Sequence, residues 1–168
     1  MAKQPSHAAV VGAGTMGTGL AVQFARHGTE ATVIDHRESN LETARRTIAD
    51  ALSFLRDEEM LAADPDAVRE SIDFTLDTGA GVSGTDLVVE TVSEDRTIKR
   101  DVFETISAAA PDDAVLASNT SGIPITELGE FVSDPQRVVG CHWWNPPYLL
   151  PLVEVVSGEE TADEIVDR

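Results

Sequence analysis

A glycine-rich turn between a predicted strand and a predicted helix limits the fold of this chain more than any other feature. The apolar run 8–11 precedes the motif GAGTMG at 12–17, and apolar residues recur at helical spacing after it. In such a motif Gly12 permits a tight turn, Gly14 lets phosphate groups approach the backbone, and Gly17 lets the helix pack closely on the strand. The unpaired N–H groups at the start of the helix favour anions. The pattern predicts a βαβ unit that binds the pyrophosphate of a dinucleotide.

An aspartate at the end of the second predicted strand, 31–34, indicates which dinucleotide is bound. The Asp35 carboxylate can accept hydrogen bonds from the adenosine ribose hydroxyls, and it would repel a 2′-phosphate. Arg37 lies two residues later and leaves NADP open as an alternative. A purely structural glycine turn is the other alternative. We predict NAD as the cofactor.

Strands and helices alternate along the rest of the chain. Further strands are predicted at 72–76, 87–90, 115–118, 137–142 and 152–156, and helices at 39–61, 96–109 and 124–129. A turn or short helix opens at 64–66, and 78–81 is predicted to be a loop. Alternation of this kind implies right-handed crossovers between parallel strands. We therefore predict an α/β fold with a Rossmann-type doubly wound, mostly parallel sheet.

The length of the chain bounds its domain organisation. A chain of 168 residues corresponds to one domain with a sizeable core, so we assign 1–168 to a single NAD-binding (Rossmann) domain. Residues 160–168 are typical of the first turns of a helix that the sequence leaves unfinished. We expect the domain to be truncated at its C-terminal end.

Acidic residues dominate the charge of the chain. The sequence holds 30 Asp and Glu against 12 Lys and Arg, a net charge of −18. A field of this sign disfavours nucleic acids and anionic membrane surfaces as partners. The acids are dispersed, and a hydrophobic content of 42% is too high for a disordered chain. We predict a solvated acidic surface suited to high salt, where self-repulsion is screened, and therefore a halophilic source.

The targeting features of the sequence favour the cytoplasm. The sequence contains no run of 18 apolar residues, and residues 1–7 are polar and unlike a signal peptide. A single cysteine, Cys141, excludes an internal disulfide and fits a reducing compartment. We interpret it as a small core residue rather than a nucleophile or metal ligand. No His/Cys cluster in the sequence has metal-ligand spacing.

Two polar segments follow the fifth and sixth predicted strands, SNTSG at 118–122 and HWWNPP at 142–147. Open α/β sheets bind ligands at these carboxyl ends of strands. Glu154 stands in an otherwise apolar strand, where a carboxylate is costly unless it is paired, and His142 is the candidate partner. Such a pair suits a dehydrogenase, because the imidazole can remove a hydroxyl proton while hydride leaves the same carbon, and the carboxylate orients the ring. A structural histidine is the alternative.

Five ordered motifs together resemble the L-3-hydroxyacyl-CoA dehydrogenase family over nearly the whole chain. They are GAGTMG, the stretch 86–99, SNTS, HWWNPP and LVEV. The resemblance implies that His142 is the catalytic base, that Glu154 is its partner, and that Ser121 contacts the reacting oxygen of the substrate. It also implies that Glu94 and Lys99 contact NAD, whereas the residues alone would indicate an ordinary solvated helix start. The predicted cofactor contacts are Gly12, Gly14, Thr15, Met16, Gly17, Asp35, Glu94, Lys99, Asn119 and Asn145.

The sequence departs from the family's pattern in several places. We expect the chain to lack the family's helical C-terminal domain, which the resemblance implies carries another catalytic asparagine and the dimer interface, so a homodimer is expected only with that domain. The family's CoA contacts fall near Ala51 and Glu58, neither of which can hold a phosphate. Residues 146–151, PPYLLP, resemble the lambda-crystallin and L-gulonate 3-dehydrogenase branch, which oxidises free hydroxy acids. Trp143 and Trp144 replace the usual phenylalanines and preserve an apolar wall.

The resemblance implies a metabolic oxidoreductase. The expected reaction is NAD-dependent oxidation of the 3-hydroxy group of a 3-hydroxyacyl-CoA, such as 3-hydroxybutyryl-CoA, to the 3-oxo compound, within the β-oxidation of fatty acids. One alternative is a dehydrogenase of a free hydroxy acid such as L-gulonate. The other is a catalytically silent NAD-binding fragment. Small molecules, rather than nucleic acid or membrane, are the expected partners.

Overall fold

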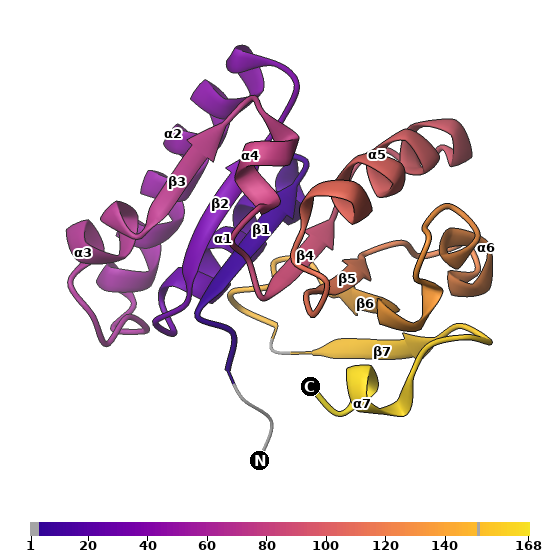
Figure 1. Cartoon of the computed structure of the whole chain (residues 1–168). Coiled ribbons are helices and arrows are strands. Elements are labelled where there is room, and N and C mark those ends of the chain that lie inside the picture. Colours follow the sequence, from indigo (N-terminus) through magenta and orange to yellow (C-terminus); the bar gives the residue numbers. More distant parts are fainter. Residues whose placement is uncertain (1–3, 151) are drawn as a thin grey trace.

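The computed structural model describes residues 4–150 and 152–168. Within them, seven strands form one sheet in the order β3-β2-β1-β4-β5-β6-β7 (Figure 1). Neighbouring strands from β3 to β6 run parallel, and β7 pairs antiparallel with β6, which confirms the predicted doubly wound, mostly parallel sheet. The strands are β1 (His7–Val11), β2 (Glu30–Ile34), β3 (Ile72–Thr75), β4 (Leu87–Glu90), β5 (Val115–Ser118), β6 (Val138–Trp143) and β7 (Val153–Ser157).

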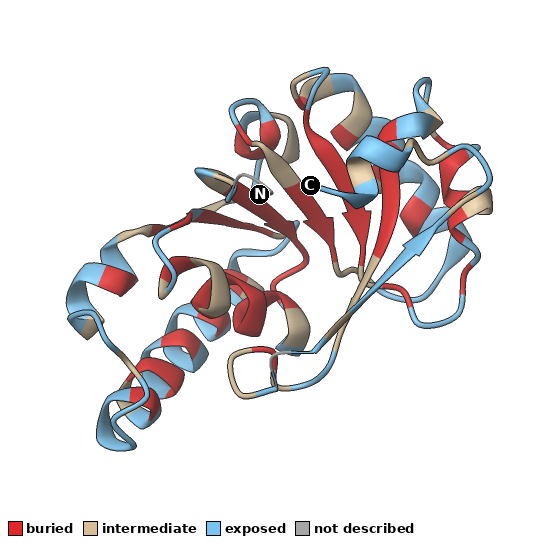
Figure 2. Ribbon diagram, turned by 90° about the horizontal axis from the view of Figure 1, so that it is seen from below, coloured by how far each residue is buried: buried red, intermediate tan, exposed pale blue. Residues whose placement is uncertain are grey.

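Helices cover both faces of the sheet (Figure 1). Side chains of the first three helices pack in one core, and those of the next three pack in a core on the other face. The helices are α1 (Thr15–Ala25), α2 (Glu38–Asp57), α3 (Pro65–Glu70), α4 (Thr78–Val82), α5 (Arg96–Ala109), α6 (Ile125–Gly129) and α7 (Asp163–Val166), with a 3₁₀ turn at Pro135–Arg137. Because helices lie on both faces, the central strands are buried on both sides (Figure 2) and are mostly apolar.

Helical periodicity accounts for the two cores. On α2, Leu41, Ile48 and Leu55 recur at intervals of seven residues, and each is at most 1% exposed. On α5, Phe103 and Ile106 are fully buried against the opposite face of the sheet. The two cores hold the strands in place, and the loops that carry the polar motifs extend from their ends.

The direction of winding reverses between β1 and β4. From β1 the chain proceeds to β2 and β3, and from β4 it proceeds to β5 and β6 on the other side. The carboxyl ends of strands on either side of such a reversal open a crevice in which α/β proteins bind ligands. β1 leads into the glycine turn, β5 leads into Asn119, and His142 lies near the end of β6. The predicted site segments therefore share one edge of the sheet.

The predicted helix 39–61 is too long at its C-terminal end, because α2 ends at Asp57. Glu59 adopts a left-handed conformation with φ 57°, the N–H of Met60 donates to Leu55 O at 2.8 Å, and the N–H of Glu59 donates to Arg56 O at 3.0 Å. This is the Schellman arrangement, which usually contains glycine at the left-handed position. A glutamate there gives no signal in the sequence.

The predicted loop 78–81 is also wrong, because these residues belong to α4. The Asp77 carboxylate accepts a hydrogen bond of 3.0 Å from the backbone N–H of Ala80 and so caps the first turn. Two glycines in the sequence TGAGV concealed this short helix. The predicted unfinished helix at 160–168 corresponds in the structure to the four-residue helix α7.

The last strand, β7, differs from the predicted strand in its bounds and in its exposure to solvent. It occupies Val153–Ser157 rather than 152–156, and it lies at the edge of the sheet. Val155 is 51% exposed and Val156 is 49% exposed. The apolar pattern of β7 therefore does not indicate a buried strand, and the side chain of Glu154 on it is 54% exposed.

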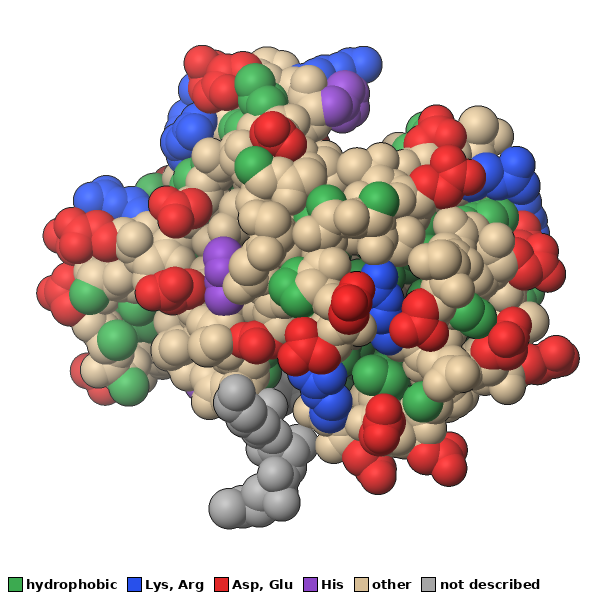
Figure 3. Space-filling view, viewed as in Figure 1, with side chains coloured by type: hydrophobic (Ala, Val, Ile, Leu, Met, Phe, Trp, Pro, Cys, Tyr) green, Lys and Arg blue, Asp and Glu red, His purple; other side chains and the backbone are tan. Residues whose placement is uncertain are grey.

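Acidic side chains are spread over the face of the molecule seen in Figure 3, and basic ones are fewer there. Several arginines pair with neighbouring acids at the surface, as Arg45 does with Glu38 and Arg96 with Glu127. Exposed pairs of this kind contribute little to stability and are screened by salt. No helix among the described residues has both the length and the apolar character needed to span a membrane. The halophilic source stays a prediction.

Candidate active site

The turn after β1 has the geometry that its glycines predict. Gly12 has φ 112°, and a Cβ on it would lie 2.8 Å from Thr91 Oγ1. A Cβ on Gly17 would lie 1.8 Å from the carbonyl oxygen of Gly12, so the helix and the turn can approach only without a side chain there. A Cβ on Gly14, by contrast, would have no heavy atom of the described residues within 4 Å. Gly12 and Gly17 are therefore required by internal packing, and Gly14 faces open space.

The N-terminal end of α1 is available to an anion. Gly14 is the N-cap residue of α1, no side-chain hydrogen bond caps this end among the described residues, and the first turn contains no acidic residue. The first N–H groups of a helix have no partner within the helix, and they carry a partial positive charge. Thr15 is exposed and Met16 is half-buried in this turn. The turn therefore fits the pyrophosphate of NAD.

Asp35 lies beside the glycine turn, as predicted. Its Oδ2 accepts a hydrogen bond of 3.0 Å from the N–H of Ala13, and its Oδ1 accepts from the N–H of Arg37 at 3.0 Å and from Asn40 Nδ2 at 2.9 Å. The side chain is only 8% exposed. Oδ1 also lies 3.3 Å from His36 Nδ1. A carboxylate has about four lone-pair positions, and Oδ2, with a single donor among the described residues, still has one to offer. Asp35 thus fixes the turn to the end of β2 and keeps acceptor capacity for one more donor.

His142 and Glu154 face each other across the β6–β7 pair. They are directly opposite in the antiparallel register, and His142 Nδ1 lies 2.7 Å from Glu154 Oε2. The hydrogen bond from His142 is the main cause that holds the pKa of Glu154 below its usual value, and a hydrogen bond from Trp144 adds to it. An ionised Glu154 fixes the Nδ1–H tautomer, which leaves Nε2 as the nitrogen that can take up a proton. The side chains are 31% and 54% exposed, respectively.

Ser121 lines the same cavity as His142. This cavity has a volume of about 240 Å³ and lies between the loop after β5 and the end of β6. Its lining residues are Thr120, Ser121, Gly122, Ile123, Pro124, Ile125, Gly140, His142 and Val156. The structure therefore brings together the predicted base and the predicted substrate-binding hydroxyl, with Glu154 behind the base.

The two predicted asparagines occupy different positions. Asn119 Oδ1 accepts a hydrogen bond of 2.8 Å from the N–H of Trp143 and so joins the ends of β5 and β6. Asn145 lines a second cavity of about 220 Å³ with Thr15 of α1 and with Thr47 and Ala51 of α2. Asn145 is thus near the glycine turn, whereas the side-chain oxygen of Asn119 has a partner inside the protein.

The two tryptophans also diverge. Trp143 packs edge-to-face on Phe24 of α1, with ring centroids 6.2 Å apart. Trp144 is 47% exposed, and its ring centroid lies 6.4 Å from that of His142. Only Trp144 therefore stands beside the predicted base, and Trp143 contributes to the core under α1.

The expected solvated helix start around Glu94 and Lys99 is wrong for Lys99. Its side chain is 1% exposed, and its Nζ lies 2.7 Å from Oε1 of Glu90, which is fully buried. Glu90 is a functional candidate that the sequence motifs did not indicate. The burial of its partner Lys99 could have been predicted, because Lys99 precedes Phe103 by four residues and Ile106 by seven, which places it on the buried stripe of α5.

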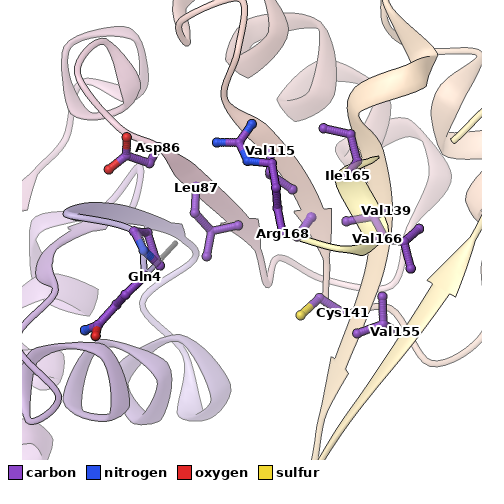
Figure 4. Close-up of a pocket in the computed structure, with 12 residues that line it drawn as sticks. Gln4, Asp86, Leu87, Val115, Val139, Cys141, Val155, Ile165, Val166 and Arg168 are labelled. Carbon is purple, nitrogen blue, oxygen red and sulfur yellow. The ribbon is translucent and has the colours of Figure 1, made fainter. Parts of the chain in front are cut away.

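A hollow larger than these two cavities lies elsewhere, between α7 and the sheet (Figure 4). It has a volume of about 270 Å³ and is lined mainly by aliphatic side chains of β4 to β7, with Ile165 and Val166 of α7. Cys141 lines it too, and burial raises the pKa of this thiol, as expected for an unreactive small side chain. The predicted site residues do not line this hollow among the described residues, so we do not assign it to the site.

The fold and the glycine turn together define a dinucleotide-binding domain. The chain belongs to the 3-hydroxyacyl-CoA dehydrogenase family: the family model for the NAD binding domain of 3-hydroxyacyl-CoA dehydrogenase matches residues 7–168. This membership confirms the resemblance found in the sequence and NAD as the cofactor.

Individual relatives support this membership. The chain is 43% identical, over 158 residues, to a 5-formyl-3-hydroxy-2-methylpyridine 4-carboxylate 5-dehydrogenase of Mesorhizobium japonicum, and the match covers 94% of this chain and 50% of the relative. It is 39% identical to a 3-hydroxybutyryl-CoA dehydrogenase of Mycobacterium tuberculosis, with 95% and 56% covered. The crystal structure of 3-hydroxybutyryl-CoA dehydrogenase from Escherichia coli K12 superposes with a TM-score of 0.91 at 34% identity, over 96% of this chain and 34% of that one. The chain thus spans about half the length of the curated relatives it matches.

Proposed function

We propose that this chain is the NAD-binding and base-carrying part of a dehydrogenase that oxidises the 3-hydroxy group of a 3-hydroxyacyl-CoA, such as 3-hydroxybutyryl-CoA, to the 3-oxo compound. The pathway we infer is the β-oxidation of fatty acids. The observation that carries the proposal is that His142 and Ser121 line one cavity, with Glu154 hydrogen-bonded to His142, at the same sheet edge as the glycine turn. The family membership of the chain supports the reaction class.

In the proposed reaction, His142 Nε2 takes the proton of the substrate hydroxyl. Glu154, which accepts from Nδ1 at 2.7 Å, stabilises the imidazolium that results. Ser121 Oγ hydrogen-bonds to the reacting oxygen while the carbonyl forms. The nicotinamide of bound NAD would supply the acceptor for the hydride that leaves the carbon bearing the hydroxyl. The proton and the hydride together account for the two hydrogens that the substrate loses.

The residues that would hold NAD form two groups. Gly14 and the start of α1 would bind the pyrophosphate, and Asp35 would accept from one adenosine ribose hydroxyl. Asn145 would lie near the nicotinamide half, next to Thr15 in the second cavity. The repulsion between the Asp35 carboxylate and a 2′-phosphate supports NAD rather than NADP.

A substitution of His142 tests the proposal. In the protein that contains this domain, we expect His142→Gln to lower kcat for 3-hydroxybutyryl-CoA by about 10²- to 10⁴-fold, the usual contribution of a general base. Calorimetry should find the Kd for NAD little changed. The control is His7→Gln, since His7 begins β1 at the opposite edge of the sheet and bonds to Thr32. Turnover of His142→Gln at the wild-type rate would exclude His142 as the base.

A free hydroxy acid is the second candidate substrate, and the cavity beside α2 favours it. The described residues that line this cavity are Thr15, Thr18, Gly19, Thr47, Ala51, Asn145, Pro146 and Tyr148, with no lysine or arginine among them. The resemblance places the family's CoA contacts on this helix, near Ala51. CoA would bring several phosphate charges to a chain of net charge −18, whereas a free hydroxy acid brings one carboxylate.

A comparison of substrates separates the candidates. We expect kcat/KM for 3-hydroxybutyryl-CoA to exceed that for L-gulonate and for free 3-hydroxybutyrate if the leading proposal holds. The opposite order would favour the free acid. Calorimetric binding of NAD with no NADH formed from any of these compounds would instead indicate a domain that binds NAD and is catalytically silent.

A further inference from the structure

We propose that Lys99 is a positioning residue and not a cofactor contact: its buried ammonium links Glu90 to Glu94 and so fixes the loop 119–122, which carries Asn119 and Ser121. The proposal deepens the function inferred above and rests on it for the role of that loop in catalysis. The contact network itself is independent of that function.

Every donor of Lys99 is already in use. Nζ lies 2.7 Å from Glu90 Oε1, 2.8 Å from Glu90 Oε2 and 3.2 Å from Glu94 Oε2. An ammonium group has three N–H donors and no acceptor. With the side chain 1% exposed, no donor is left to point towards a ligand. Lys99 can therefore influence NAD only through the residues it holds.

Glu90 places this ion pair at the reversal point of the sheet. It ends β4, where it stands in register with Val11 of β1 and with Ser118 of β5. Its carboxylate accepts a hydrogen bond of 2.6 Å from Ser118 Oγ and one of 2.7 Å from the N–H of Val92. The buried pair is therefore tied to β5 immediately before the loop that carries Asn119.

Glu94 extends the network to the other end of the loop. Its Oε1 accepts hydrogen bonds from Thr120 Oγ1 and from the N–H of Gly122, the latter at 3.2 Å. The N–H of Ile123 donates to Thr120 Oγ1 at 3.0 Å. Burial alone would raise the pKa of Glu94, but the bonds from Thr120, Lys99 and Gly122 together with the charge of Lys99 lower it, so the group stays ionised. Lys99 therefore holds the loop through Glu90 on one side and through Glu94 on the other.

Stability alone does not account for a lysine at this position. Lys99 lies in the first turn of α5, after the capping residue Asp95, where the helix dipole disfavours a cation. Burial disfavours the charge further, and replacing a buried ion pair by apolar side chains is often neutral or stabilising. An arrangement that bears both costs is better explained by the geometry it imposes on the loop than by the free energy it adds.

The test is Lys99→Met, read first in the protein without NAD. Because the loop amides donate to Glu94 and Thr120, we expect hydrogen exchange at Gly122 and Ile123 to become faster. With NAD and substrate present, we expect kcat to fall by about 10²-fold, the effect of misplacing reacting groups by about 1 Å, with a smaller change in KM. The double variant Glu90→Gln/Lys99→Met, which leaves no unpaired buried charge, should give the same two changes and covers the case in which Lys99→Met does not fold.

Arg137→Met is the matched control. Arg137 is likewise a buried cation, 5% exposed, but its guanidinium donates to Ser107 O and Pro111 O at the other end of α5. We expect it to lower the melting temperature and to leave exchange in the loop unchanged. Unchanged loop exchange in Lys99→Met would overturn the proposal, and a weaker NAD affinity with that result would indicate direct contact instead. A wild-type protein that fails to bind NAD would defeat the proposed function, whereas the exchange comparison without NAD would still decide the role of Lys99.

Discussion

The glycine turn after β1 and the histidine–glutamate pair of β6 and β7 lie at the same edge of the sheet but are built in opposite ways. The turn depends on backbone packing: a Cβ on Gly17 would lie 1.8 Å from the carbonyl oxygen of Gly12, and both glycines are buried. The pair depends on two side chains, one of which is 54% exposed on an edge strand. Damage to Gly12 or Gly17 should therefore affect folding and binding together, whereas damage to the pair should affect the reaction alone.

The largest effect is expected from Gly17→Ala. Its Cβ would lie 1.8 Å from a backbone oxygen, which cannot rotate away as a side chain could. We expect NAD binding to be lost and the free energy of unfolding to fall by about 3 kcal/mol, the upper part of the usual range for overpacking. Calorimetry and denaturant unfolding measure the two quantities. Gly84→Ala, which would meet no described heavy atom within 4 Å, is the control and should change neither.

The second-largest effect is expected from a change in the histidine–glutamate pair, which should lower the reaction rate without lowering the stability of the fold. Glu154→Gln keeps the shape of the side chain but no longer selects the Nδ1–H tautomer of His142. We expect kcat to fall by about 10²-fold or more, because a base in the wrong tautomer cannot take up the proton. The melting temperature should stay close to that of the wild type, since the carboxylate is exposed. A large loss of stability in Glu154→Gln would mean that the pair supports the fold as the glycine turn does, and would contradict the difference inferred between the two regions.

The sequence predicts the fold and the location of the site better than it predicts the individual contacts within the site. Alternating apolar segments and the order of motifs predicted the parallel sheet and the edge at which the motifs meet. The pairing of His142 with Glu154 was predicted from the cost of a buried carboxylate, yet β7 is exposed, so the contact is present for a different reason.

The features that the sequence concealed depend on contacts between distant segments or on unusual residues. Lys99 was interpreted from its charge rather than from its place on the buried stripe of α5, and its partner Glu90 comes from another element. The end of α2 was missed because Glu59 occupies a left-handed position that usually holds glycine. For Lys99, the charge of the residue predicts exposure, but its place in the helical repeat puts it in the core. For Glu59, the residue type predicts that the helix continues, but its left-handed backbone conformation ends the helix.

Substitution of Gly14 in the turn should weaken NAD binding without lowering the stability of the fold. A Cβ on Gly14 meets no heavy atom of the described residues, so Gly14→Ala should fold with wild-type stability. The same Cβ would stand where the backbone is open to a pyrophosphate. We expect Kd for NAD to rise about tenfold, equivalent to about 1.4 kcal/mol. Titration calorimetry and thermal melting on the same sample would check both parts. Equal losses of stability in Gly14→Ala and Gly17→Ala would contradict the distinct roles assigned to the two glycines.

The smallest effect should come from the titration of Glu94, which contacts Lys99 and the loop 119–122. Its pKa in the folded protein is lowered, for although burial opposes the charge, the hydrogen bond from Thr120 and the charge of Lys99 favour it. The unfolded value for a glutamate is about 4.3, so the stability that ionised Glu94 contributes is fully present above that pH and is lost as the pH falls through the lower, folded pKa.

Glu94→Gln removes this titration. The difference in melting temperature between wild type and Glu94→Gln should be constant from pH 7 to about pH 5 and should shrink as the pH falls further below the ordinary glutamate value. It should be small throughout, because the side chain is 43% exposed and water screens its interactions. Glu130→Gln, at an exposed position after α6, corrects for the loss of one charge from an acidic chain. A difference that persists unchanged at low pH would mean that Glu94 acts through its shape and hydrogen bonds, and that its charge does not hold the loop.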